Sequence, residues 1–269
     1  MLDMSYFRNR AFSIGSGGMI LVFLGMFGVM FLMTQYLQLV LGFTPLGAAV
    51  RLLPMTPVML IVSPLTPRLS ARFGAHRVVA IGMSLLAVGF ALFSRTSPHS
   101  SYVYVLLCLL PFMSGAALTM SPMTTAIMSA VPPRRAGAGS AMNDATRELG
   151  AALGVAVLGS LAASKYTSRL SSVVAPLSAA ARHTARSSLT GALQVASGLP
   201  HAQSVSVVNG AKVAFVDGIH IACFGGAALS LCAAALVLRY LPSPARAVAM
   251  EPAPVSIALE PSPVPATAE

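Results

Sequence analysis

Long stretches without a charged side chain are the feature that most restricts what this chain can fold into. No Asp, Glu, Lys or Arg stands between Arg10 and Arg51, and none stands between Arg95 and Arg134. About 20 apolar residues are enough to cross a bilayer as a helix, whereas a membrane β-strand would alternate apolar and polar residues over about 10 positions. The sequence therefore predicts an all-α integral membrane protein.

The overall composition agrees with this class. Hydrophobic residues make up 56% of the 269 positions and charged residues only 9%, whereas a soluble domain carries about 25% charge. The formal charge of +10 is spread in small groups at the ends of apolar runs, with no aromatic-interleaved basic patch, so no nucleic acid partner is expected. The cysteines lie in apolar runs without the spacing of a metal site, and no metal or other cofactor is expected. They are Cys108, Cys223 and Cys232.

The apolar runs divide the chain into three parts. We expect a cytoplasmic lead at 1–10, a membrane domain at 11–240 and a disordered, Pro/Ala-rich cytoplasmic tail at 241–269. A long outer loop at 164–212 is too polar to cross the bilayer, although its segment 179–193 alternates small and basic residues and favours an amphipathic helix. Six transmembrane helices are expected, at about 11–33, 46–66, 77–94, 102–129, 141–163 and 215–239.

A basic turn between the second and third expected spans predicts the orientation. Arg68, Arg72 and Arg77 stand in this short turn, and short loops rich in Arg and Lys stay on the cytoplasmic side. If the N-terminus is inside, Arg95 is the single basic residue of the short outer loops. The sequence therefore predicts a multi-pass protein of the cell membrane with both termini in the cytoplasm.

The same turn resembles the loop signature of the major facilitator superfamily, Gly-x-Leu-x-Asp-Arg-x-Gly-x-Arg-Arg. Leu69, Arg72, Gly74 and Arg77 match it. Ala71 stands where the family has an aspartate that pairs with neighbouring helices. The resemblance implies one six-helix half of a major facilitator fold.

Two further stretches resemble the fourteen-span drug:proton antiporters of that superfamily. Residues 7–12 are similar to the lead into their ninth span, and residues 143–150 are similar to the start of their thirteenth. The long loop before the last span is also similar. The resemblance covers residues 3–240 and is specific to the C-terminal half of such a multidrug efflux antiporter.

This resemblance implies a transporter and no enzyme. It implies proton-coupled efflux of hydrophobic or cationic small molecules across the lipid bilayer. Because the substrate cavity of such a transporter lies between two halves, we expect the chain to need a missing N-terminal half or a second copy. A truncated, non-transporting membrane protein, or a partner subunit of another transporter, is the alternative.

Four ionisable residues inside the expected spans are candidates for contact with substrate or protons. Asp144, Arg147 and Glu148 are three and four residues apart and share one helix face. They either take part in proton coupling and gating or stabilise the helix start at the cytoplasmic interface. Arg51, roughly 9 Å along the second span from Pro45, either contacts an anionic group within the membrane or reaches the outer surface.

Prolines and glycines are expected to shape the helix packing. Pro54 and Pro111 each remove a backbone donor, which favours kinks. Gly150 and Gly154 form a Gly-xxx-Gly pair that lets two helices approach closely.

Overall fold

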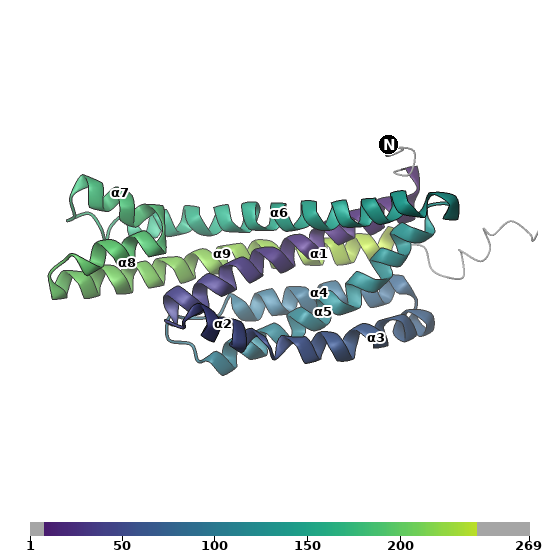
Figure 1. Ribbon diagram of the computed structural model, residues 1–269, viewed down its shortest axis with the longest axis horizontal. Coiled ribbons are helices and arrows are strands. Elements are labelled where there is room, and N and C mark those ends of the chain that lie inside the picture. The colour runs from purple at the N-terminus through teal and green to yellow at the C-terminus, as the bar shows by residue number, and fades with distance from the viewer. Residues whose placement is uncertain (1–7, 241–269) are drawn as a thin grey trace, which may run out of the picture.

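The computed structural model describes residues 8–240, and in that range the chain forms long helices that run side by side (Figure 1). The predicted disordered tail and most of the predicted cytoplasmic lead lie outside the described residues. The helical elements are α1 (Arg10–Gln35), the π-helical turn η2 (Tyr36–Val40), α2 (Pro45–Leu52), α3 (Met55–Phe73), α4 (Ala75–Phe93), α5 (Tyr102–Ser129), the 3-10 turn η3 (Pro133–Arg135), α6 (Ala136–Leu170), α7 (Ala179–Ser187), α8 (Leu189–Ser197) and α9 (His201–Tyr240).

Six helical stretches of the described chain are long and apolar enough to cross a membrane. The all-α membrane class predicted from the sequence is therefore confirmed. The stretches are Phe12–Val40, Pro45–Phe73, Ala75–Phe93, Tyr102–Ser129, Ala136–Leu170 and His201–Tyr240.

The bundle has two distinct ends (Figure 1). We call the end with the α3–α4 and α5–α6 turns the basic end, and the end that carries α7 and α8 the cap end. α6 and α9 contain 35 and 40 residues, which makes them about 52 Å and about 60 Å long at 1.5 Å per residue. Because a bilayer core is about 30 Å thick, both helices are long enough to project beyond it.

The extra length of these helices changes the description of the predicted outer loop at 164–212. α6 extends to Leu170 and α9 already begins at His201, and two short helices lie between them. Ser178 and Ser188 accept hydrogen bonds from the first turns of α7 and α8, which are favourable N-caps. The segment expected to form one amphipathic helix is therefore two helices, divided at Ser188.

Proline affects two of the spans differently. The second span is divided into α2 and α3 around Leu53 and Pro54, because Pro54 has no N–H to continue the ladder and its ring clashes with the preceding turn. α5 continues as one helix through Pro111.

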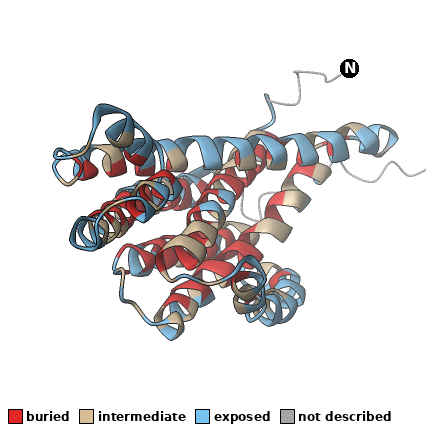
Figure 2. Ribbon diagram, turned by 60° about the vertical axis from the view of Figure 1, so that its left-hand side comes forward, coloured by how far each residue is buried: buried red, intermediate tan, exposed pale blue. Residues whose placement is uncertain are grey.

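The helices are buried to very different extents (Figure 2). α4 packs against α5 and α9, and α1 packs against α6, α5 and α9. The rings of Phe90 and Phe112 meet edge-to-face in this core, with centroids 5.2 Å apart. In the most apolar part of the first span 56% of the residues are buried, whereas in that of the second span, which contains α3, only 11% are buried. α3 therefore presents most of its surface outside the bundle.

Candidate functional site

A row of phenylalanines runs along one side of α1. Phe23, Phe27 and Phe31 recur every four residues, and Gln35 continues the row. The rings of Phe23 and Phe27 are nearly parallel, with centroids 5.8 Å apart. Phe23 is buried, but Phe27 and Phe31 are 41% and 42% exposed. We call these three phenylalanines the aromatic row.

α6 lies directly against α1 because glycines remove the side chains that would separate the two backbones. A Cβ added at Gly150 would lie 2.6 Å from the Ile20 carbonyl oxygen, and one at Gly154 would overlap the Leu24 carbonyl. The structure thus places the Gly150–Gly154 pair at the α1–α6 contact. Any larger side chain there would force the helices apart.

A pocket of about 320 Å³ opens between α1, α6, α8 and α9 toward the cap end. Its walls are largely apolar, and Phe31, Leu189 and Phe215 supply the largest apolar side chains. The Gln35 amide and several hydroxyl side chains, among them Ser160, add hydrogen-bonding groups. None of the described residues that line the pocket is charged. Such walls suit a lipophilic molecule with a few polar groups.

A second hollow, of about 410 Å³, continues from this pocket along α1. It shares Phe31, Gln35 and Val155 with the pocket and reaches Phe27. Phe27, Phe31 and the pocket therefore form one continuous surface, which we call the α1–α6 face.

Arg147 lies at the other end of the aromatic row. Its Cζ atom is 5.0 Å from the centroid of the Phe23 ring, which is within the range of a cation–π interaction. Its Nε atom is buried and has no hydrogen-bond partner among the described residues.

Asp144 and Glu148 lie near Arg147 on α6, and both are exposed. For neither is an ion pair recorded within the described part of the chain. Because α6 starts at Ala136, Asp144 and Glu148 lie about 12 and about 18 Å from the helix start at 1.5 Å per residue. This is deeper in the helix than the predicted start at residue 141 implied.

Glu148 and Val155 are seven residues apart and therefore lie on the same side of α6. Since Val155 lines the pocket beside Phe31, the carboxylates and the aromatic row belong to one side of the α1–α6 pair. Exposed carboxylates in a membrane helix need water or a partner. This side of the pair is therefore suited to a polar or water-filled space.

Arg51 is not brought near this cluster. It lies in the last turn of α2, at the cap end (Figure 1). The Arg51 Cζ atom is 3.8 Å from the Phe43 ring centroid, and its Nη1 donates to the Gly47 carbonyl at 3.1 Å. The backbone carbonyl of Arg51 accepts a hydrogen bond from the Tyr102 hydroxyl at 2.8 Å. The side chain is thus bound by neighbouring residues of α2 and of the turn before it.

The residues of the loop signature lie at the basic end, away from the pocket. Gly74 separates α3 from α4 with a φ of +86°, a value that favours glycine. Leu69 is half-buried, and Arg72 and Arg77 are exposed.

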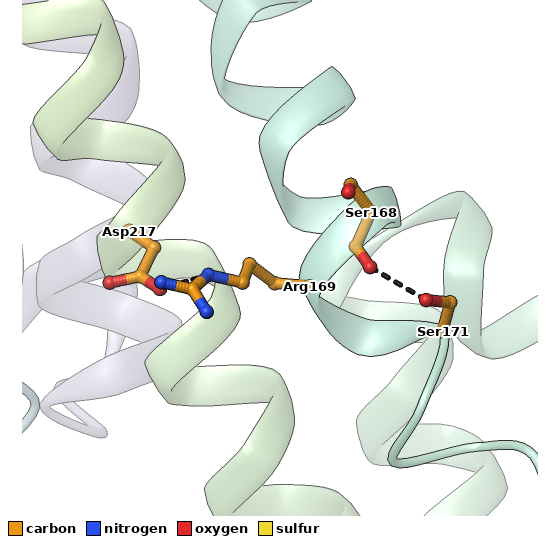
Figure 3. Close-up of polar contacts among 4 residues, drawn as sticks. All are labelled: Ser168, Arg169, Ser171 and Asp217. Carbon is orange, nitrogen blue, oxygen red and sulfur yellow. Dashed lines mark hydrogen bonds and ion pairs between the residues drawn. The ribbon is translucent and has the colours of Figure 1, made fainter.

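Polar contacts connect α9 to its neighbours at the cap end. Arg169 of α6 pairs with Asp217 of α9 at 2.9 Å, between Nε and Oδ2 (Figure 3). Lys212 donates to the Val40 carbonyl at 2.8 Å, and His220 Nε2 donates to the Thr96 carbonyl at 2.7 Å. These contacts join α9 to α6, η2 and the α4–α5 loop.

Sequence reasoning missed the aromatic row, the pocket and the contacts of Arg169 and Lys212. The four-residue spacing of Phe23, Phe27 and Phe31 was the available signal. It was hidden because α1 is apolar on all sides, so that no polar residues mark which side is exposed. Among the described residues, no group of three or more His, Cys, Asp or Glu side chains could hold a metal ion.

The sequence profile of the Major Facilitator Superfamily matches residues 3–155. Among curated proteins, the multidrug resistance protein Stp of Mycobacterium tuberculosis is 37% identical over 170 residues, which is 63% of this chain and 32% of the relative. The multidrug efflux pump LfrA of Mycolicibacterium smegmatis is 30% identical over 237 residues, 88% of this chain and 47% of the relative. The methyl viologen resistance protein SmvA of Salmonella typhimurium is 33% identical over 220 residues, 80% of this chain and 43% of the relative.

All three relatives are longer than this chain. The aligned region spans between 32% and 47% of their length.

Proposed function

Because the chain belongs to the major facilitator superfamily, we propose that it forms part of a transporter that moves hydrophobic or cationic small molecules out of the cell. The observation that carries this proposal is the α1–α6 face. There, exposed Phe27 and Phe31 adjoin an uncharged, largely apolar pocket. The names of the relatives, which refer to multidrug efflux and resistance, support the same function.

The chemistry of the face favours flat lipophilic molecules and organic cations. An aromatic ring attracts a cation over its face with roughly 0.5 to 2 kcal/mol, more when water is excluded. Two exposed rings one helical turn apart offer two such contacts to one ligand. A relative is named for resistance to methyl viologen, which is a flat dication.

Asp144 and Glu148 are the groups that we propose to couple this movement to protons. They are exposed carboxylates on the side of α6 that carries the pocket. A carboxylate that opens to a polar space within the membrane can bind and release a proton. Arg147 stands between them in the sequence, and its guanidinium lies over the Phe23 ring.

No other helix of the described chain covers the exposed rings of the α1–α6 face, and we propose that a second six-helix half packs over them. This half comes either from a separate polypeptide segment or from a second copy of this chain. This chain aligns with less than half of the length of each relative, which supports the proposal. We further propose that the basic end faces the cytoplasm, because its arginines lie in short turns.

Substrate binding tests the role of the face directly. The purified chain in lipid nanodiscs should bind ethidium, a flat aromatic cation, with a measurable fluorescence change. Phe27→Ala/Phe31→Ala should weaken this binding by about tenfold, the loss expected from two cation–π contacts. Phe224→Ala/Leu231→Ala on α9 is the matched control, since Phe224 and Leu231 are 59% and 52% exposed away from the face. Equal losses in both variants would contradict the proposed site.

Transport assays test the proposed second half and the proton coupling. Ethidium efflux should be measured in cells that lack their own efflux pumps, with the chain produced alone or with the remaining half of the LfrA homologue. Efflux only on co-production supports a separate half, and efflux by a dimer of this chain supports a second copy. No efflux in either case would favour a non-transporting membrane protein. Where efflux occurs, Glu148→Gln should abolish its dependence on the proton gradient without weakening ethidium binding.

A further inference from the structure

The α3–α4 turn holds an unusual concentration of positive charge with no carboxylate nearby in the sequence. Arg68, Arg72 and Arg77 are all exposed. No Asp or Glu stands between Asp3 and Asp144. Of the described carboxylates, Asp217 lies at the cap end and Asp144 and Glu148 lie on α6. No ion pair is recorded for these three arginines among the described residues, so their charge is available to an external anion.

An exposed apolar surface leads along α3 to these arginines. Ile61, Leu65, Arg68 and Arg72 are spaced by four, three and four residues, so they line one side of the helix. Ile61 and Leu65 are 68% and 45% exposed. The same helix side is thus apolar over two turns and then becomes basic at the end of the span.

The backbone of the turn favours an anion at the same place. Gly74 is the N-cap of α4 and provides no side-chain cap, so the first N–H groups of α4 lack a side-chain acceptor. The helix dipole adds partial positive charge at this end. Beside it, Ser70 Oγ and His76 Nδ1 are buried with no hydrogen-bond partner among the described residues.

We propose that this surface binds an anionic phospholipid of the adjoining leaflet. The phosphate group meets Arg68, Arg72 and Arg77, and the acyl chains lie along Ile61 and Leu65. A phospholipid matches both parts of the surface, whereas free phosphate or nucleic acid matches only the basic part. Because α3 is so little buried within the bundle, no other helix of the described chain covers this surface.

Lipid binding to the purified chain tests this proposal. Native mass spectrometry should detect phosphatidylglycerol retained on the protein in preference to phosphatidylcholine. Arg68→Gln/Arg72→Gln should lower the affinity for phosphatidylglycerol by about tenfold, because each basic residue near a membrane surface contributes to anionic lipid attraction. Arg77 and Arg134 keep positive charge at this end in the variant, which preserves its orientation.

Arg182→Gln/Arg186→Gln is the matched control. These arginines are also exposed, also four residues apart, and lie on α7 at the cap end. This variant should retain phosphatidylglycerol as the unchanged chain does. Equal retention of both lipids by the unchanged chain, or equal losses in the two variants, would overturn the proposal. Displacement of the lipid by inorganic phosphate alone would likewise show that the acyl part of the surface has no role.

Discussion

The two ends of the helical bundle hold their positive charges in different ways. At the cap end, Arg51, Lys212 and Arg169 each bond a carbonyl or a carboxylate of the protein itself. At the basic end, Arg68 and Arg72 are exposed, and no ion pair is recorded for them among the described residues. Contacts within the chain therefore hold these three charges of the cap end, although Arg182 and Arg186 there are exposed, whereas Arg68 and Arg72 depend on their surroundings.

This difference implies that the two ends respond to different conditions. A change in lipid charge should affect the basic end, where our proposed lipid site lies. The cap end should keep its structure in any bilayer and respond instead to the loss of its own contacts. Three experiments at the cap end test this distinction.

Tyr166→Ala should have the largest effect. Tyr166 is buried, and its hydroxyl donates to the carbonyls of Ala185 at 2.8 Å and Ser188 at 3.1 Å. Removing a buried aromatic ring costs about 3 to 5 kcal/mol, so α7 and α8 should detach from α6. Trypsin should then cleave faster at Arg182 and Arg186.

The exposed Tyr240 provides the control, and Tyr240→Ala should leave this cleavage unchanged. The effect should also be the same in neutral and anionic nanodiscs. Protection of the Tyr166 variant by anionic lipid would break the comparison between the two ends.

Lys212→Met should have an intermediate effect. It removes the bond to the carbonyl of Val40, the last residue of η2, and leaves that carbonyl without its cationic donor. The expected loss of stability is about 1 to 2 kcal/mol, measured as a lower thermal midpoint in nanodiscs. Lys165→Met is the matched control, because no bond of the Lys165 side chain is recorded among the described residues. A smaller loss for Lys212 than for Lys165 would contradict the assigned role.

The Arg169–Asp217 pair should have the smallest effect. Arg169 is 60% exposed, so solvent screens the interaction, and exposed pairs contribute about 0.2 to 1 kcal/mol. A double-mutant cycle with Arg169→Gln and Asp217→Asn should give a coupling energy in this range that declines with added salt. A coupling that grows with salt would show that the pair acts by some means other than charge.

The number of spans could be predicted from the sequence because charge is costly in hydrocarbon and apolar runs must be long. Which side of each span is exposed could not be predicted in the same way. The first and second spans are similarly apolar, yet 56% of the residues in the most apolar part of the first are buried and only 11% in that of the second. Burial depends on which helices become neighbours, and hydropathy carries no information on that choice.

The candidate site was predictable only in part, for the same reason. Asp144, Arg147 and Glu148 stood out because ionisable residues are rare in spans. The aromatic row did not, since Phe27 differs little from its neighbours in hydropathy. Beyond the amphipathic segment at 179–193, the helical structure of 164–212 was hidden because this cap packs with small residues such as Ala192 and Ala211, which do not form a strong apolar pattern.

The unbroken length of α6 gives the molecule a mechanical property. One continuous helix carries the Gly150–Gly154 contact with α1 and, farther along, the base of the cap. Leu170 at the far end of α6 lies about 27 Å beyond the middle of this contact, so a tilt of about 10° there displaces it by about 5 Å. Small rocking movements at the α1–α6 contact are therefore amplified at α7, where a single distance probe would record them from outside the membrane.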